Sequence, residues 1–195
     1  MKNILIMGIG RAGKTTLSDM IKDKWNSYNL LHSDSLKWAI IRAKDKEDYY
    51  RKNVDIQKEF EHGEFFQKTL LELYNSLIRK DKQEYGYILE SGQLSPKIVS
   101  GMIDFNKTYV ICLGLGNLTA EDMVEQCIKY DTKESWTYGL SRDYLLEHAK
   151  DWYYCNEMLK QECPKYNIKY IDTSKNRFNI FETILNEIEM VNKFD

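Results

Sequence analysis

Short apolar runs recur along the chain, and longer segments with a helical spacing of apolar residues lie between them. The strand-like runs lie at residues 4–7, 30–31, 87–89, 109–113 and 169–171. The clearest helical patterns lie at residues 15–25, 56–79, 120–130, 141–161 and 179–192. Strands that alternate with helices predict an α/β fold. We expect a five-stranded parallel sheet with helices on both faces, which is a three-layer α/β/α arrangement.

The same pattern predicts how the chain is divided. We expect one domain over residues 1–195, because this length suffices for one core and no linker or repeat separates two. The polar, turn-rich residues 131–145 lie between two predicted helices and are candidates for a helical lid. Residues 45–80 form either a helical insertion on the substrate side or an ordinary covering helix. Pro164 marks the end of the helix before the last strand.

The turn after the first apolar run carries a specific motif. Residues 8–15 read G-I-G-R-A-G-K-T, a complete G-x-x-x-x-G-K-[ST] phosphate-binding loop. The loop follows a strand-like run and opens a helical pattern, which is the context that the motif requires. We therefore expect a nucleoside triphosphate to bind here. The alternative is a glycine-rich turn that contains Gly-Lys-Thr without binding a ligand.

The chemistry of this loop assigns roles to its residues. Glycines let the backbone approach a polyphosphate, and successive N–H groups then form an anion nest at the positive end of the helix. Lys14 can reach the β- and γ-phosphates, the Thr15 hydroxyl can ligate Mg²⁺, and Thr16 can reach the α-phosphate. The predicted nucleotide-binding residues are Gly8, Gly10, Arg11, Ala12, Gly13, Lys14, Thr15 and Thr16.

Polar residues just after the other strands are further candidates, because parallel sheets bind ligands at the carboxyl ends of their strands. Asp34 is predicted to orient or deprotonate an acceptor hydroxyl; the alternative is helix capping by residues 33–35. Glu90 is predicted to hold Mg²⁺ through water or to bind substrate, and Gln93 to contact substrate. The alternative for Glu90 is a turn residue that caps the next helix. Which of Asp34 and Glu90 is the acceptor-side base stays open.

Two further polar patterns lie later in the chain. Arg142, in the predicted lid, is a candidate catalytic residue that would neutralise charge on a transferred phosphoryl group. The alternative is a solvated charge paired with Asp143 or Glu147. Thr119, with Asp122 three residues on, predicts the capped start of a helix.

Composition narrows the classes of partner. The net charge is −2 and no basic block occurs, so we expect no nucleic-acid partner. No stretch approaches the roughly 20 apolar residues of a membrane span, and the first strand lies too near the N-terminus for a signal peptide. The four cysteines lack metal-ligand or C-x-x-C spacing. We expect buried reduced thiols and a cytoplasmic location.

Taken together, the chain resembles the P-loop small-molecule kinases of the nucleoside-monophosphate-kinase-like superfamily. The resemblance rests on GIGRAGKTT at residues 8–16, HSDS at 32–35, LESGQ at 89–93, Arg142 and DTSKN at 172–176. It implies a parallel sheet, a lid that closes over the ATP phosphates, and an acceptor near the second and third strand ends. Lys14 is similar to the phosphate-binding lysine, Thr15 to the Mg²⁺ ligand, Asp34 to the acceptor-side acid and Arg142 to a lid arginine.

The predicted function is therefore an ATP- and Mg²⁺-dependent phosphotransferase that acts on a nucleoside, a nucleotide or a hydroxyl-bearing metabolite, as a monomer or homodimer. The alternative is a P-loop ATPase or a nucleotide-binding regulatory protein without an acceptor. A GTPase would need N-K-x-D after a strand, whereas the sequence at 106–109 lacks the aspartate and precedes a strand. An ATPase would show an apolar run that ends in Asp-Glu, and none is visible.

Overall fold

The centre of the structure is a five-stranded sheet. In the computed structural model, which describes residues 1–79, 85–133 and 135–192, the strand order is β2-β3-β1-β4-β5 and neighbouring strands pair in parallel. The strands are β1 (Asn3–Gly8), β2 (Tyr28–His32), β3 (Gly86–Ser91), β4 (Thr108–Gly114) and β5 (Lys169–Asp172). Each predicted apolar run lies in one of these strands, so the predicted α/β fold class is confirmed.

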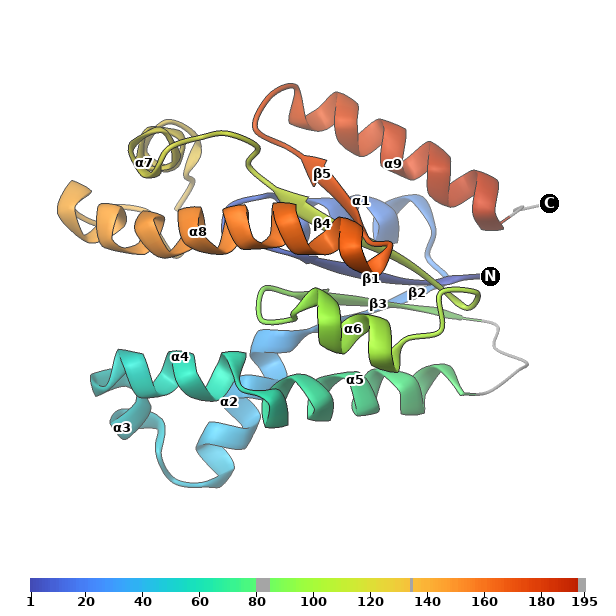
Figure 1. Cartoon of the computed structure of the whole chain (residues 1–195), viewed down its shortest axis with the longest axis horizontal. Coiled ribbons are helices and arrows are strands. Elements are labelled where there is room, and N and C mark those ends of the chain that lie inside the picture. The colour runs from blue at the N-terminus through green and yellow to red at the C-terminus, as the bar shows by residue number, and fades with distance from the viewer. Residues whose placement is uncertain (80–84, 134, 193–195) are drawn as a thin grey trace.

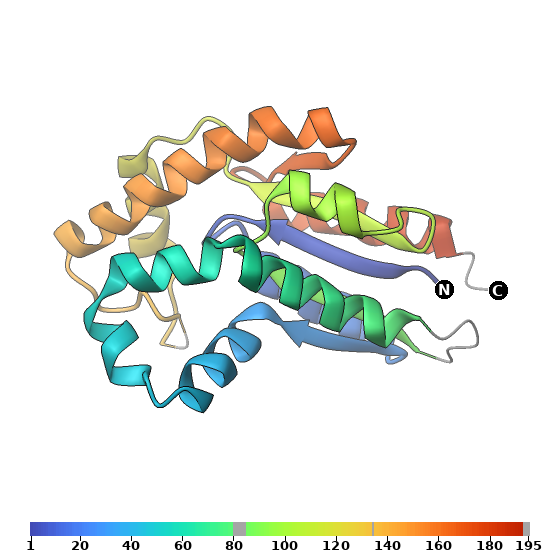
Figure 2. The same ribbon diagram turned by 60° about the horizontal axis from the view of Figure 1, so that its bottom comes forward.

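Helices cover both faces of the sheet, which gives the predicted three layers (Figures 1 and 2). α1 and α9 lie on one face, and α5, α6 and α8 lie on the other. The helices are α1 (Lys14–Lys24), α2 (Ser33–Ala43), α3 (Glu47–Lys52), α4 (Val54–His62), α5 (Glu64–Ile78), α6 (Pro96–Met102), α7 (Ala120–Tyr130), α8 (Arg142–Glu162) and α9 (Arg177–Asn192). A 3₁₀ turn, η1 (Cys163–Tyr166), contains Pro164 and follows α8, as predicted.

β1 is the most protected strand because it lies in the middle of the sheet with helices above and below it. All of its residues are buried, which explains why it reads as a continuous apolar run rather than an alternating one. From one face Leu17 of α1 covers the core, and from the other Leu70 of α5 does so. The strand that leads into the phosphate loop is therefore a rigid base for it.

The helical pattern at residues 56–79 was predicted as one helix, and this is wrong. Two helices occur there, α4 and α5, and Gly63 separates them in an extended conformation with φ −67° and ψ 151°. The N–H of Gly63 donates to the carbonyl of Phe60 (3.3 Å), and the N–H of Gln67 donates to the carbonyl of Gly63 (3.2 Å). α5 contributes buried residues to the core, whereas α4 has none and only Phe60 of α4 packs against the core.

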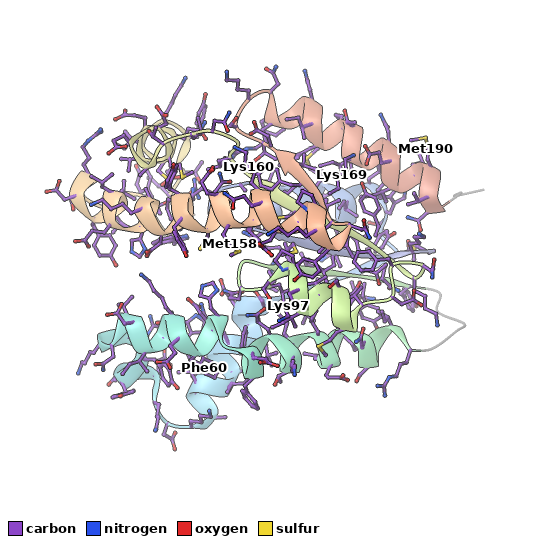
Figure 3. The ribbon with its side chains drawn as sticks, in the orientation of Figure 1. Phe60, Lys97, Met158, Lys160, Lys169 and Met190 are labelled. Carbon is purple, nitrogen blue, oxygen red and sulfur yellow. The ribbon has the colours of Figure 1, made fainter. Side chains whose placement is uncertain are left out.

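Two parts of the chain project past the carboxyl edge of the sheet (Figure 1). α3 and α4 lie in the predicted insertion at 45–80, where Phe60 of α4 packs on Tyr50 of α3 and Phe66 of α5 (Figure 3). α7 and the start of α8 flank the predicted lid at 131–145. Residues 80 and 134 of these ranges lie outside the described residues. The roles of insertion and lid remain predictions.

The helix starts test two capping expectations. α7 begins with a capping box in which Thr119 accepts from the N–H of Asp122, and the Asp122 side chain accepts from the Thr119 N–H, as predicted. α2 differs from expectation, because it already begins at Ser33 with His32 at the N-cap position and without a side-chain cap bond. Asp34 therefore lies inside the first turn, and capping does not account for it.

Three of the four cysteines are buried, as the sequence predicts. Cys112, Cys127 and Cys163 are buried, Cys155 is half-buried, and all four are free thiols. Within the described ranges, no helix combines the length and the apolar character that crossing a membrane requires.

Candidate active site

The phosphate loop connects the buried end of β1 to the first turn of α1. Gly13 precedes this turn in the left-handed region with φ 88°. A Cβ at Gly13 would lie 2.7 Å from Cζ of Phe181, so both backbone conformation and space require glycine. Because glycine has no capping side chain, the first amides of α1 are available to an anion.

Lys14 begins α1 and is buried against the loop. Its Nζ donates to the carbonyl of Ile9 (2.8 Å), which holds the ammonium over the loop backbone. Burial lowers the pKa of Lys14, while the nearby carboxylates of Glu90 and Asp34 act in the opposite direction. The cation therefore lies between the loop and the acidic side chains at the ends of β2 and β3. This is the position from which a lysine can bind the β- and γ-phosphates.

An aromatic cluster from α8 packs on the same loop. A Cβ at Gly10 would lie 2.7 Å from Nε1 of Trp152, so this indole sets how close the loop and α8 approach. Trp152 stacks with His148 (ring centroids 6.2 Å apart) and meets Trp136 of the predicted lid edge to face (6.0 Å). Burial lowers the pKa of His148, and Lys58 adds to this effect. The predicted lid is thus joined to the loop through aromatic rings.

Glu90 connects the loop to the end of β2. The strand register sets His32 beside Glu90, and the His32 Nδ1 lies 2.7 Å from Oε2 of Glu90. The Thr15 hydroxyl donates to the same oxygen (3.3 Å). A hydroxyl and a carboxylate next to a phosphate loop form a hard oxygen set that suits Mg²⁺. In the described residues, no group of three or more His, Cys, Asp or Glu side chains forms a metal cage of its own.

Asp34 and Gln93 are brought together from neighbouring strand ends. The Gln93 Nε2 donates to Oδ1 of Asp34 (3.0 Å), and Oε1 of Gln93 accepts from Ser33 (2.5 Å) and Ser91 (3.1 Å). Lys37 donates to the same Asp34 oxygen (2.9 Å). Partial desolvation by the surrounding protein acts to raise the pKa of Asp34, but Lys37, with further help from Gln93, outweighs it and the pKa falls. Asp34 is thus an exposed, ionised carboxylate with a fixed orientation.

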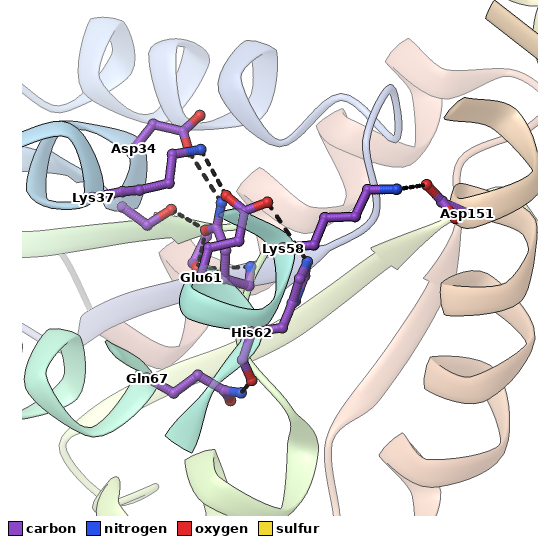
Figure 4. A network of polar contacts seen from close by, with 10 residues as sticks. Asp34, Lys37, Lys58, Glu61, His62, Gln67 and Asp151 are labelled. Carbon is purple, nitrogen blue, oxygen red and sulfur yellow. Dashed lines mark hydrogen bonds and ion pairs between the residues drawn. The ribbon is translucent and has the colours of Figure 1, made fainter. Parts of the chain in front are cut away.

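Two ion pairs extend this group toward other helices (Figure 4). Lys37 also contacts Oε2 of Glu61 on α4 (2.7 Å), and the Glu61 side chain is only 12% exposed. Lys58, one turn earlier on α4, reaches across to Asp151 of α8. α4 is therefore linked by ion pairs both to α2 and to α8.

The two arginines predicted for the site lie in different surroundings. Arg11 lies in the left-handed region with φ 64°, and its guanidinium pairs with Asp131, which follows α7. Asp131 also accepts from Thr137, so the loop is tied to the predicted lid segment. Arg142 is exposed at the start of α8 and pairs with Glu125 of α7, not with Asp143 or Glu147 as the alternative supposed. The structure does not bring Arg142 into the group around Asp34.

Sequence reasoning missed Arg177 as a loop neighbour. Arg177 begins α9, its Nε donates to the carbonyl of Thr173 (3.3 Å), and its Cδ would lie 3.2 Å from a Cβ at Gly13. Burial, with Arg11 nearby, lowers the pKa of Arg177. Thr173 in turn donates its hydroxyl to the carbonyl of Ala12 (2.8 Å). The available signal was the polar loop after the last strand, but its side chains read equally as helix caps.

Comparison with known proteins identifies the fold. No model of a protein family matches the sequence, and no curated protein sequence matches it. Solved structures do match over nearly the whole chain. A shikimate kinase from Bacteroides thetaiotaomicron aligns with a TM-score of 0.54 and 15% identity, covering 99% of this chain and 99% of that chain.

Two further structures agree with this result. A shikimate kinase from Acinetobacter baumannii in complex with shikimate has a TM-score of 0.53, 18% identity and coverage of 100% and 96%. A deoxyadenosine kinase from M. mycoides with bound dATP has a TM-score of 0.52, 16% identity and coverage of 97% and 100%. The chain shares the fold of these solved kinases. At identities this low, the structural matches establish the fold only. The reaction has to be inferred from the residues of the site.

Proposed function

We propose that the chain is an ATP- and Mg²⁺-dependent phosphotransferase that acts on a hydroxyl group of a small molecule. The observation that carries this proposal is the juxtaposition of Lys14 and Asp34. Lys14, a buried lysine after β1, lies within electrostatic reach of Asp34, an exposed, ionised carboxylate just after β2. In the sheet, β3 lies between these two strands. Phosphate donor and hydroxyl acceptor can therefore meet between them. The solved kinase structures of the same fold support this choice of reaction.

The residues of the site have different proposed roles in phosphoryl transfer. Loop amides and Lys14 bind the β- and γ-phosphates and stabilise the charge that develops on the transferred group. Thr15, with Glu90 through water, would hold Mg²⁺, which supplies further neutralisation of phosphate charge. Both contacts of Asp34 use Oδ1, so Oδ2 can accept the proton of the attacking hydroxyl. Because Lys37 and Gln93 fix this carboxylate, the hydroxyl is oriented before transfer.

Arg142 retains a proposed role that requires movement. It would have to leave Glu125 and approach the phosphates when residues 131–145 close. Arg11 is better placed at the loop, but its pairing with Asp131 makes it a link to the same segment. Four free thiols and a nucleotide donor fit a cytoplasmic location, which we also propose.

ADP release from Mg-ATP tests the proposal. Wild type and Lys14→Ala are compared over a panel of nucleosides, nucleotides, sugars, sugar acids and aminoglycosides. We expect one class of acceptor to stimulate release in wild type, and a roughly 10³-fold loss in Lys14→Ala because a buried phosphate-binding cation is removed. Lys22→Ala, an exposed lysine on the same helix, is the control and should match wild type.

Two results would contradict a kinase. Rapid turnover that no acceptor stimulates would indicate an ATPase. Tight ATP binding without turnover over the whole panel would indicate a nucleotide-binding regulatory protein. Both are read from the same samples, since ATP binding is measured alongside ADP release.

A further inference from the structure

Lys37 is the only lysine of α2, and its ammonium group pairs with two carboxylates. Its Nζ lies 2.9 Å from Oδ1 of Asp34 and 2.7 Å from Oε2 of Glu61. Its side chain is 8% exposed, so the ammonium is enclosed by these two carboxylates and not presented to solvent. Figure 4 shows Lys37 beside Asp34, which is on the same helix, and reaching to Glu61 of α4.

This arrangement differs from that of a lysine available to a ligand. Burial opposes the charge on Lys37, but Glu61 and Asp34 outweigh it and raise the pKa. Drawing the ammonium toward an anionic ligand would leave the enclosed Glu61 carboxylate with only the more distant His62, whose Nε2 lies 4.0 Å from Oε1, and this is unfavourable. Lys37 is thus committed to neutralising the protein's own acids.

Three other cations on this side of the molecule are also paired with carboxylates. Lys58 of α4 pairs with Asp151 of α8. Arg42 and Arg51 both pair with Glu47, at 2.7 Å each. Of the described cations near Asp34, Lys37 is thus paired with two carboxylates of the protein, and Lys14 is the one that we assign to the ATP phosphates.

We propose that the phosphoryl acceptor is a hydroxyl compound that carries no phosphate or carboxylate group, and is either neutral or cationic. This inference rests on the proposed kinase function and names its substrate class. An anionic acceptor held beside Asp34 would face the carboxylates of Asp34 and Glu90, while Lys37 is held by Asp34 and Glu61 and Lys14 by the phosphates of ATP. Like charges at close range oppose binding. Hydroxyl and ammonium groups instead donate hydrogen bonds to the same oxygens.

Matched acceptor pairs test the charge preference in wild type. Each nucleoside is compared with its 5′-monophosphate, and each sugar or amino sugar with the corresponding sugar phosphate or sugar acid. We expect kcat/KM for the uncharged or cationic member to exceed that of its anionic twin at least about tenfold, and ADP release to depend on Lys14. A preference for an anionic member would overturn the inference while leaving the kinase function intact. Absence of any stimulation would contradict the kinase function itself.

Glu61→Gln tests whether Lys37 sets the preference. The amide removes one of the two charges that occupy Lys37, so the lysine gains capacity to bind an anion. We expect the ratio of kcat/KM for the anionic twin to that for the neutral twin to rise about tenfold. Glu64→Gln is the matched control, because Glu64 is 68% exposed on α5 and pairs with Lys68. A ratio that stays at the wild-type value in a folded Glu61→Gln protein, checked by thermal melting, would contradict the assignment to Lys37.

Discussion

The phosphate loop lies within residues 8–16, whereas the group around Asp34 comes from α2, α4 and the turn after β3. The loop is built mainly from backbone, with a buried strand behind it and a helix start in front. The Asp34 group is built from side chains, and the Asp34 side chain itself is 65% exposed. One half of the site therefore depends on backbone space and the other half on matched charges.

The two halves should fail in different ways when a single residue is changed. Apart from Lys14, we expect the loop to tolerate changes of side chain better than the addition of a Cβ at its glycines. The Asp34 group tolerates small steric changes but not the loss of a charge. Substitutions of each kind, applied to each half, test this distinction.

Asp34→Asn has the largest expected effect on chemistry. The amide keeps the shape of the side chain but accepts no proton, so kcat should fall roughly 10³-fold. The Kd for Mg-ATP should change less than about threefold, because the phosphate loop is left intact. Titration of Mg-ATP and ADP release with the best acceptor separate the two quantities.

The control for Asp34→Asn is Asp23→Asn, the same chemical change at an exposed position on α1. It should leave both kcat and Kd at wild-type values. Equal transfer by wild type and Asp34→Asn would remove Asp34 from the mechanism, and Glu90 would then be the candidate base. An equal loss of ATP affinity would mean that the two halves of the site are not separable.

Gly13→Ala tests the opposite half with a change of one methyl group. A Cβ there would lie 2.7 Å from the Phe181 ring, in a left-handed conformation that alanine adopts at a cost. We expect a loss of about 2–3 kcal/mol in the free energy of unfolding and weaker ATP binding. Denaturant titration and Mg-ATP binding measure these effects.

Gly101→Ala is the matched control for Gly13→Ala. Gly101 lies in α6 with no atom within 4 Å of a Cβ, so the same substitution should leave stability unchanged or raise it slightly. If Gly13→Ala behaved like Gly101→Ala, the loop would be less constrained than its contacts indicate. The contrast between the two glycines then would not reflect a backbone-built site.

The same distinction explains what the sequence could predict. The loop is a run of adjacent residues, and the strand-end rule brought Asp34, Glu90 and Gln93 to one edge because parallel strands end together. The pairing of Lys37 with Asp34 at i+3 was not predicted, although a helix beginning near Ser33 would bring the two side chains together. The second partner of Lys37, Glu61, was not visible, because it comes from α4 and the pairing depends on how that helix packs.

Two other features were hidden for physical reasons. Arg11 pairs with Asp131, and 120 positions separate the two residues in the chain. No local sequence pattern indicates such a contact. The break at Gly63 was missed because a glycine inside a helical pattern costs only about 1 kcal/mol and is often tolerated. Here the turn allows α4 to leave the direction of α5 and bring Glu61 to Lys37. The break between α4 and α5 therefore matters for the one partner of Lys37 that comes from α4.

The smallest expected effect is a shift in pH dependence when Lys37 is replaced. Lys37 counteracts the partial desolvation that would raise the pKa of Asp34, so Lys37→Met should raise this pKa. The Glu61 carboxylate, which remains in the variant, adds to the rise. Transfer needs ionised Asp34, so activity is lost as pH falls through the pKa. The acid limb of kcat should thus move to higher pH in Lys37→Met. Measurement at saturating Mg-ATP, with Lys22→Met as the exposed control, isolates Asp34 from the donor. If the acid limb of kcat stayed at its wild-type pH, Lys37 would not control the ionisation of Asp34. The contrast between a side-chain-built acceptor side and a backbone-built loop would then be contradicted.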